Sequence, residues 1–138
     1  MIGFIFGTTM GDVVKSELEY RTECVSNERV KNIVSSYLIV FKRDGNLYAH
    51  SRDLFDSLSE RQQVLVSLLG YEAGFREKHL ELPFRNKDTL FTRFPLTPVH
   101  EGAFKDLVAE GIIEREGTRV PVFAISPERL DDVVEGFE

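Results

Sequence analysis

The clearest pattern of apolar and polar positions lies between residues 97 and 111, and it predicts a helix. Apolar residues recur there every three or four positions, so one face of the helix would be apolar. These residues are Val99, Ala103, Leu107 and Val108. Thr97 can cap the helix with its hydroxyl, and Pro98 suits the first position, where no N–H is needed. Gly111 can adopt the left-handed conformation that ends a helix.

A two-stranded hairpin is predicted directly after this helix. Ile112 and Ile113 open the first strand, and Gly117-Thr118 can turn the chain because glycine tolerates a positive φ. Pro121 lacks the N–H that a ladder needs, which predicts that the returning strand lies at a sheet edge. The alternating residues expected on one face of that strand are Val120, Val122 and Ala124.

A further capped helix follows the hairpin. Ser126 can cap it, and Pro127 occupies its first position. Its apolar side would consist of Leu130, Val133 and Val134. The pattern therefore predicts a helix, a hairpin and a second helix in direct succession.

Residues 52–80 also have a mainly helical pattern. Ser57 or Ser59 can cap a helix, and Glu60 or Gln62 three residues later would complete a capping box in either register. Gly70 and Gly74 would either interrupt the helix or let another element pack closely against it. The apolar face comprises Leu58, Val64, Leu65, Leu68 and Leu69. Between residues 80 and 96, a short helix starting at Asn86 or Asp88 and a partly structured loop are both compatible with the sequence.

The C-terminal third resembles the end of prokaryotic and archaeal winged-helix regulators. In such proteins a recognition helix ends in an acidic-glycine-apolar turn, a hairpin wing follows, and a Ser/Thr-Pro-Glu helix closes the domain. The matching residues here are Leu107, Glu110, Gly111, Ile112, Ile113, Ser126, Pro127, Glu128 and Leu130. The resemblance implies a winged-helix-like domain over residues 51–138, with helix 97–111 as its recognition helix.

The first fifty residues are predicted to form a separate, β-rich unit. The short apolar run at residues 1–7 suits a buried strand, and residues 13–24 alternate loosely as a second strand would. Residues 27–34 fit either a short helix or a loop. Residues 37–41 read as a strand that turns at Asp44-Gly45 and returns over residues 47–49. The expected class is α+β, with a β-rich unit (1–50) before the winged-helix-like domain (51–138).

Composition indicates an intracellular globular protein. The chain has 138 residues, of which 42% are hydrophobic, and that content is sufficient for a core. Its single cysteine, Cys24, cannot form an intrachain disulfide, which fits a reducing compartment. The N-terminus lacks the basic segment of a signal peptide, and its apolar run is too short to span a bilayer. We therefore expect a cytoplasmic protein without membrane contact.

Charge weighs against the most obvious partner, double-stranded DNA. Residues 96–138 carry 4 basic and 10 acidic side chains, a net charge of −6, whereas DNA binding depends largely on neutralising phosphates. A few cations on one face can nevertheless suffice. The candidates for DNA contact are Arg85, Lys87 and Arg93 before the recognition helix, His100 and Lys105 on it, and Arg115 and Arg119 on the wing.

No catalytic constellation is evident in the sequence. His50, His79 and His100 lie far apart and lack the short spacing of metal ligands on one element, and the carboxylates are scattered. We therefore expect a non-enzymatic protein without a metal or cofactor. The first hypothesis is a DNA-binding transcription regulator, with a homodimer as a compatible state. The alternative is an acidic adaptor that uses the winged helix to bind a partner protein.

Overall fold

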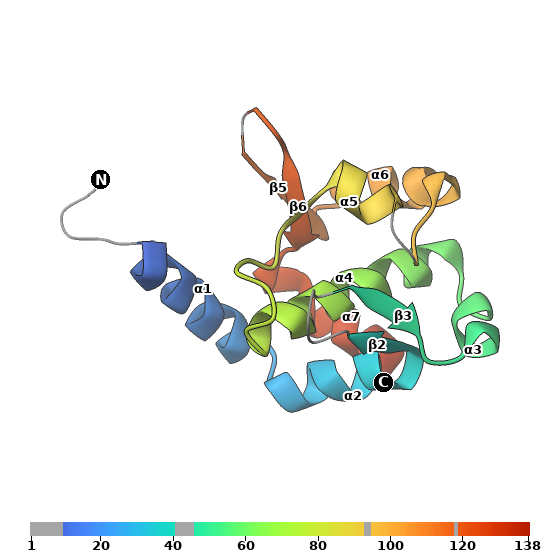
Figure 1. Ribbon diagram of the computed structural model, residues 1–138, viewed down its shortest axis with the longest axis horizontal. Coiled ribbons are helices and arrows are strands. Elements are labelled where there is room, and N and C mark those ends of the chain that lie inside the picture. Colours follow the sequence, from blue (N-terminus) through green and yellow to red (C-terminus); the bar gives the residue numbers. More distant parts are fainter. Residues whose placement is uncertain (1–9, 41–45, 93–94, 118) are drawn as a thin grey trace.

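Helices and two small sheets together form the α+β structure of this chain. The computed structural model describes residues 10–40, 46–92, 95–117 and 119–138 (Figure 1). The apolar strand expected at residues 1–7 and the turn at Asp44-Gly45 lie outside these residues. None of the helices in the described ranges has both the length and the apolar composition needed to cross a membrane.

The central element is helix α4, Glu60–Arg76, which runs through the middle of the molecule (Figure 1). Of the two capping boxes that the sequence left open, the one at Ser59 is observed: the Gln62 N–H donates to Oγ of Ser59 at 3.2 Å, and the Ser59 N–H donates to Oε1 of Gln62 at 3.1 Å. Every residue from Val64 to Arg76 is buried. The other elements therefore pack around α4 on all sides.

The helix continues through both glycines, which serve close packing. A Cβ on Gly70 would lie 2.8 Å from Cδ2 of Leu47, and one on Gly74 would lie 3.0 Å from Cδ1 of Leu80. At these distances the ends of the two leucine side chains would have to shift to admit a methyl group. Of the two roles that the sequence left open for the glycines, close approach is therefore the one observed.

A three-stranded antiparallel sheet lies beside α4. Its strands are β4 (Arg85–Asn86), β5 (Ile113–Glu116) and β6 (Val122–Ile125), in the order β4-β6-β5. The prediction that the returning strand lies at an edge is wrong, because β6 is central. Pro121 immediately precedes β6, so its missing N–H leaves the ladder intact.

Burial along β6 does not follow the predicted alternation of Val120, Val122 and Ala124, because Phe123, Ala124 and Ile125 are all buried. Phe123 and Ile125 belong to the hydrophobic core, whereas Val120 is 62% exposed. Phe123 contacts Phe104, which in turn contacts Phe91, both edge to face with centroids 5.0 and 5.3 Å apart. Such aromatic pairs add to the stabilisation from burial alone.

The predicted helix, hairpin and second helix are confirmed as local structure, but Oγ of Ser126 donates to Oε2 of Glu128 and makes no capping hydrogen bond. Residues 98–100 form a 3-10 turn, η1 (Pro98–His100), which leads into α6 (Glu101–Ala109). Gly111 has a φ of 77°, as expected for the residue that ends the helix. After the hairpin, η2 (Pro127–Arg129) leads into α7 (Leu130–Phe137). The buried residues of α7 are Leu130, Val133 and Val134, as predicted.

Between α4 and η1 the chain forms a short helix, α5 (Lys87–Thr92), so the helical alternative for residues 80–96 is confirmed. The N–H of Thr89 donates to Oδ1 of Asn86 at 2.8 Å and helps to begin this helix. The buried Leu90 and Phe91 attach α5 to the core. From α4 onward the chain therefore runs through β4, α5, η1, α6, β5 and β6.

The expectation of a β-rich unit over residues 1–50 is wrong for the described part of that range. It contains the helices α1 (Met10–Cys24) and α2 (Asn27–Tyr37), followed by only two short strands, β2 (Leu38–Val40) and β3 (Leu47–Ala49). In α2 the buried residues are Val30, Ile33 and Val34, which recur at the spacing of one helix face. The side chain of Ser26 caps the start of this helix. The antiparallel pairing of β2 with β3 is as predicted.

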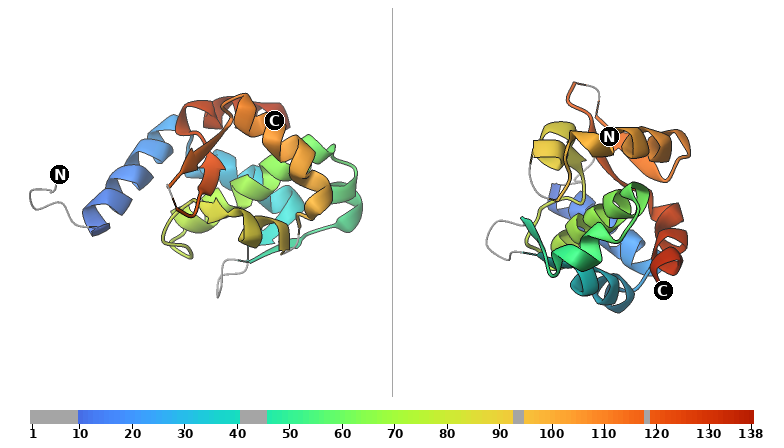
Figure 2. Two further views of the ribbon diagram at one scale, coloured as in Figure 1. Left: turned by 90° about the horizontal axis from the view of Figure 1, so that it is seen from above. Right: turned by 90° about the vertical axis from the view of Figure 1, so that its right-hand side faces the viewer.

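These N-terminal elements share a core with the C-terminal part. The hydrophobic cluster includes Val30 and Leu38 together with Val64, Phe104 and Val134. A small helix, α3 (Arg52–Asp56), joins β3 to α4 and buries Phe55. Helix α1 differs from the others: its N-terminal half extends away from the body, while its C-terminal end packs against it (Figures 1 and 2).

Candidate nucleic-acid interface

The outward face of η1 and α6 carries small residues together with one cation and one carboxylate. Phe104 and Leu107 point into the core, so the residues between them face solvent. Val99, predicted to belong to the apolar stripe, is instead 67% exposed. Because η1 is a 3-10 turn with fewer residues per turn than an α-helix, its side chains do not continue the apolar face of α6. The exposed residues of this face are Val99, Gly102, Lys105, Asp106 and Ala109.

Two carboxylates that made this helix look acidic have basic partners. Arg61 of α4 donates from Nη1 and Nη2 to the two carboxylate oxygens of Glu110, at 2.7 and 2.8 Å. These hydrogen bonds hold the pKa of Glu110 below its usual range. Glu101 lies 4.0 Å from Nζ of Lys87. Both negative charges are therefore partly offset, which leaves α6 less repulsive to an anion than its sequence suggests.

The β5–β6 hairpin rises beside this face (Figure 1). Gly117, with a φ of 87°, lies in its turn, as predicted. Arg115, Arg119 and Val120 are all exposed on the hairpin. The hairpin can therefore present cations to a ligand that also touches α6.

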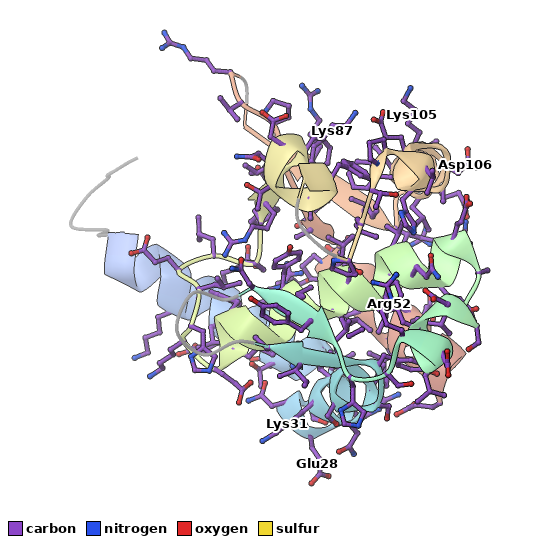
Figure 3. All side chains as sticks on the ribbon, turned by 45° about the vertical axis from the view of Figure 1, so that its right-hand side comes forward. Glu28, Lys31, Arg52, Lys87, Lys105 and Asp106 are labelled. Atoms are coloured by element: carbon purple, nitrogen blue, oxygen red, sulfur yellow. The ribbon has the colours of Figure 1, made fainter. Side chains whose placement is uncertain are left out.

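The structure brings several of the predicted residues to one side of the molecule. Lys87 of α5 and Lys105 of α6 both lie at the top in Figure 3, away from Lys31 of α2. Arg85 is half-buried, with its guanidinium carbon 5.5 Å from the centroid of the Tyr71 ring. Arg93 lies outside the described residues. Lys105, Arg115 and Arg119 are the exposed cations that remain from the predicted set, and Lys87 is half-buried, with 42% of its side chain exposed beside Glu101.

His100 is the predicted residue that the structure removes from the interface. It is only 5% exposed, and its Nε2 lies 2.7 Å from Oε1 of Gln63 on α4. The N–H of Thr97 donates to its Nδ1 at 3.1 Å. His100 therefore fixes the start of α6 on α4 and cannot reach a ligand on the outward face.

A buried charge network, which sequence reasoning missed, holds the hairpin and α1 on α4. The Glu72 carboxylate accepts from Nε of Arg21 on α1 and from Nε of Arg76, both at 2.8 Å. Arg21 is fully buried and Glu72 is 1% exposed. Arg21 also donates from Nη2 to the carbonyl of Ile125 on β6. The only sign of this network in the sequence is that Glu72 and Arg76 stand four residues apart in an otherwise apolar helix, a spacing at which side chains can pair.

One donor in this network faces a group of carboxylates. Nη1 of Arg21 is buried and has no hydrogen-bond partner among the described residues. It lies 3.8 Å from the carboxylate of Glu114 on β5 and 4.0 Å from that of Glu17. Burial raises the pKa of Glu114 to about 7, against the attraction of Arg21. Glu17, Glu116 and Glu128 raise this pKa further by repulsion.

Three exposed carboxylates on α7 form the one group in the described ranges whose oxygens lie close enough to share a cation. Asp131, Asp132 and Glu135 hold oxygens within 4.8 Å of one another. Asp131 already accepts a hydrogen bond from Nη1 of Arg29 at 2.8 Å. A metal ion at this position would compete with Arg29 for Asp131. We therefore interpret the three carboxylates as part of a solvated helix face.

Comparisons with family models, with curated proteins and with solved structures found no significant match to this chain.

Proposed function

We propose that this protein binds double-stranded DNA as a winged-helix transcription regulator, with α6 as the recognition helix and the β5–β6 hairpin as the wing. The observation that carries the proposal is the element order from α4 to β6 combined with the strand order β4-β6-β5. This is the arrangement in which a helix-turn-helix (α5 and α6) is followed by a hairpin that flanks the recognition helix.

The outward face of α6 suits the major groove of DNA. The groove admits one α-helix, and small residues such as Gly102 and Ala109 allow close approach. Lys105 on α6 and Lys87 on α5 would contact phosphates on either side of the helix. Arg115 and Arg119 would contact the backbone beside the wing, because phosphate contacts fix the register of a protein on the duplex.

The proposal fixes the salt dependence of binding. Four phosphate contacts predict that log K falls with log salt with a slope of about −3.6, from about 0.9 per neutralised phosphate. The net charge of the protein, −6, opposes approach of DNA at long range, so binding should be strongest at low ionic strength.

Fluorescence anisotropy with a labelled mixed-sequence duplex would test the proposal. Lys105→Glu should weaken binding at least tenfold, because it replaces a phosphate contact by repulsion. Lys31→Glu makes the same charge change on α2, on the opposite side of the molecule, and should have little effect (Figure 3). Flat titrations of the wild type at low salt and micromolar protein, or equal losses in both variants, would remove the proposal.

A second candidate function, a protein-interaction adaptor, is supported by a different surface. Ile39 and Tyr48 are paired across β2 and β3 and are 50% and 48% exposed. Adjacent exposed apolar side chains are typical of protein contacts. If this function holds, a pull-down with the wild type should recover a partner protein in stoichiometric amount. Ile39→Ser should abolish this recovery, whereas Lys105→Glu should not. Recovery of nucleic acid alone would count against the adaptor.

A further inference from the structure

Val99 is an exposed apolar side chain at the place where a recognition helix meets base edges. It lies in η1, one turn before Gly102 on the outward face of α6, and is 67% exposed. Among the large hydrophobic residues whose side chains the structure describes, none has a higher exposed fraction. The N-terminal residues of a recognition helix are those that contact bases.

The turn that carries Val99 is rigidly attached to the body. His100, the next residue, is buried and lies 2.7 Å from Gln63 of α4 through its Nε2. The N–H of Thr97 donates to Nδ1 of the same ring. These contacts hold the backbone on both sides of Val99, so the position of its Cα is set before any ligand arrives.

The surroundings of Val99 leave space for a flat partner. A Cβ on Gly102 would meet no described atom within 4 Å, so the surface beside Val99 is open. Lys105, one turn further along the same face, supplies a cation for the backbone or a guanine edge. An apolar side chain such as that of Val99 can contact the thymine C5-methyl group, which an A·T pair presents in the major groove.

We propose that Val99 is a specificity-determining residue that reads the C5-methyl group of a thymine in the major groove. This inference rests on the proposed function, because it requires α6 to enter DNA. It adds that the preferred site contains a thymine opposite the start of α6. Val120, 62% exposed on the hairpin, would lie outside the major groove and would not read this methyl group.

The test uses the full-length chain and a random-sequence duplex library. Sequences enriched by the wild type are resynthesised with each thymine replaced in turn by deoxyuridine, which removes only the methyl group. At one position this replacement should weaken wild-type binding about fourfold, the value of one buried methyl-sized group. Val99→Ala should bind the thymine and uracil duplexes equally at that position, whereas Val99→Ile should retain the difference.

Val120→Ala is the matched control, since it shortens the other strongly exposed valine in the proposed interface. It should keep the fourfold preference for thymine. A library that shows no enrichment, or a methyl effect of the same size in wild type and Val99→Ala, would overturn the inference while DNA binding itself stands. Failure of the wild type to retain any duplex would overturn the proposed function and the inference together.

Discussion

Replacing Glu72 by Gln is the most informative test of how this fold is held together. Both oxygens of the carboxylate accept hydrogen bonds, one from Arg21 and the other from Arg76. Glutamine keeps the shape but offers one acceptor and one NH2 group, which would face a guanidinium donor. It also leaves two buried guanidinium groups without their counter-charge.

The magnitude follows from the burial of all three groups. Arg21 and Glu72 are 0% and 1% exposed, and Arg76 is 7% exposed. Removing one partner of a buried ion pair costs about 3–5 kcal/mol, because an uncompensated charge remains in the interior. At about 2.1 cal/mol/K of unfolding entropy per residue, this loss lowers the Tm of a 138-residue chain by about 10–17 °C.

Glu110→Gln provides the matched control. It makes the same chemical change in a two-point contact with arginine, but the side chains of Arg61 and Glu110 are 44% and 46% exposed. An exposed pair is worth at most about 1 kcal/mol. Circular dichroism melts and urea titrations of the three proteins would give the comparison. If Glu72→Gln loses no more stability than Glu110→Gln, the network does not hold α1 and the sheet on α4.

Further predictions concern the Glu114 carboxyl and the glycines of the proposed interface. The pKa of Glu114 is raised from 4.5 to about 7, so the folded state holds its proton more tightly than the unfolded state. Stability should fall as pH rises from about 4.5 to 7, and Glu114→Gln should remove this fall. At pH 8 the variant should be about 1–2 kcal/mol more stable than wild type in urea titrations, less than the whole shift because the side chain is still 29% exposed; parallel pH profiles of the two proteins would contradict the assignment. Gly117→Ala should lower stability by about 1–2 kcal/mol, since φ is positive and its Cβ would lie 2.7 Å from the carbonyl oxygen of Val120. Gly102→Ala, in helix α6 with open space around it, should instead raise the Tm slightly, and a loss equal to that of Gly117→Ala would refute the distinction.

The sequence alone determined the elements whose signals are local. Thr97-Pro98 and Ser126-Pro127 mark the starts of helical segments, and Gly111 and Gly117 mark positions with positive φ. These signals arise from the backbone of a few neighbouring residues, so they can be read without knowing the fold. For the same reason the capping box at Ser59 and the antiparallel pairing of β2 with β3 were correctly predicted.

Only the tertiary structure decided which of these residues face one another. The loose alternation of residues 13–24 suits a strand, but they belong to helix α1, whose Arg21 is buried against Glu72, far away in sequence. His100 and Val99 exchange their expected positions, since the contact of His100 with Gln63 buries the ring and turns the valine outward. The charge of Glu110 on α6 is partly offset by Arg61 of α4, a partner that the sequence alone does not indicate. Burial and charge pairing are sums over distant neighbours, and only the packing of the whole chain specifies those neighbours.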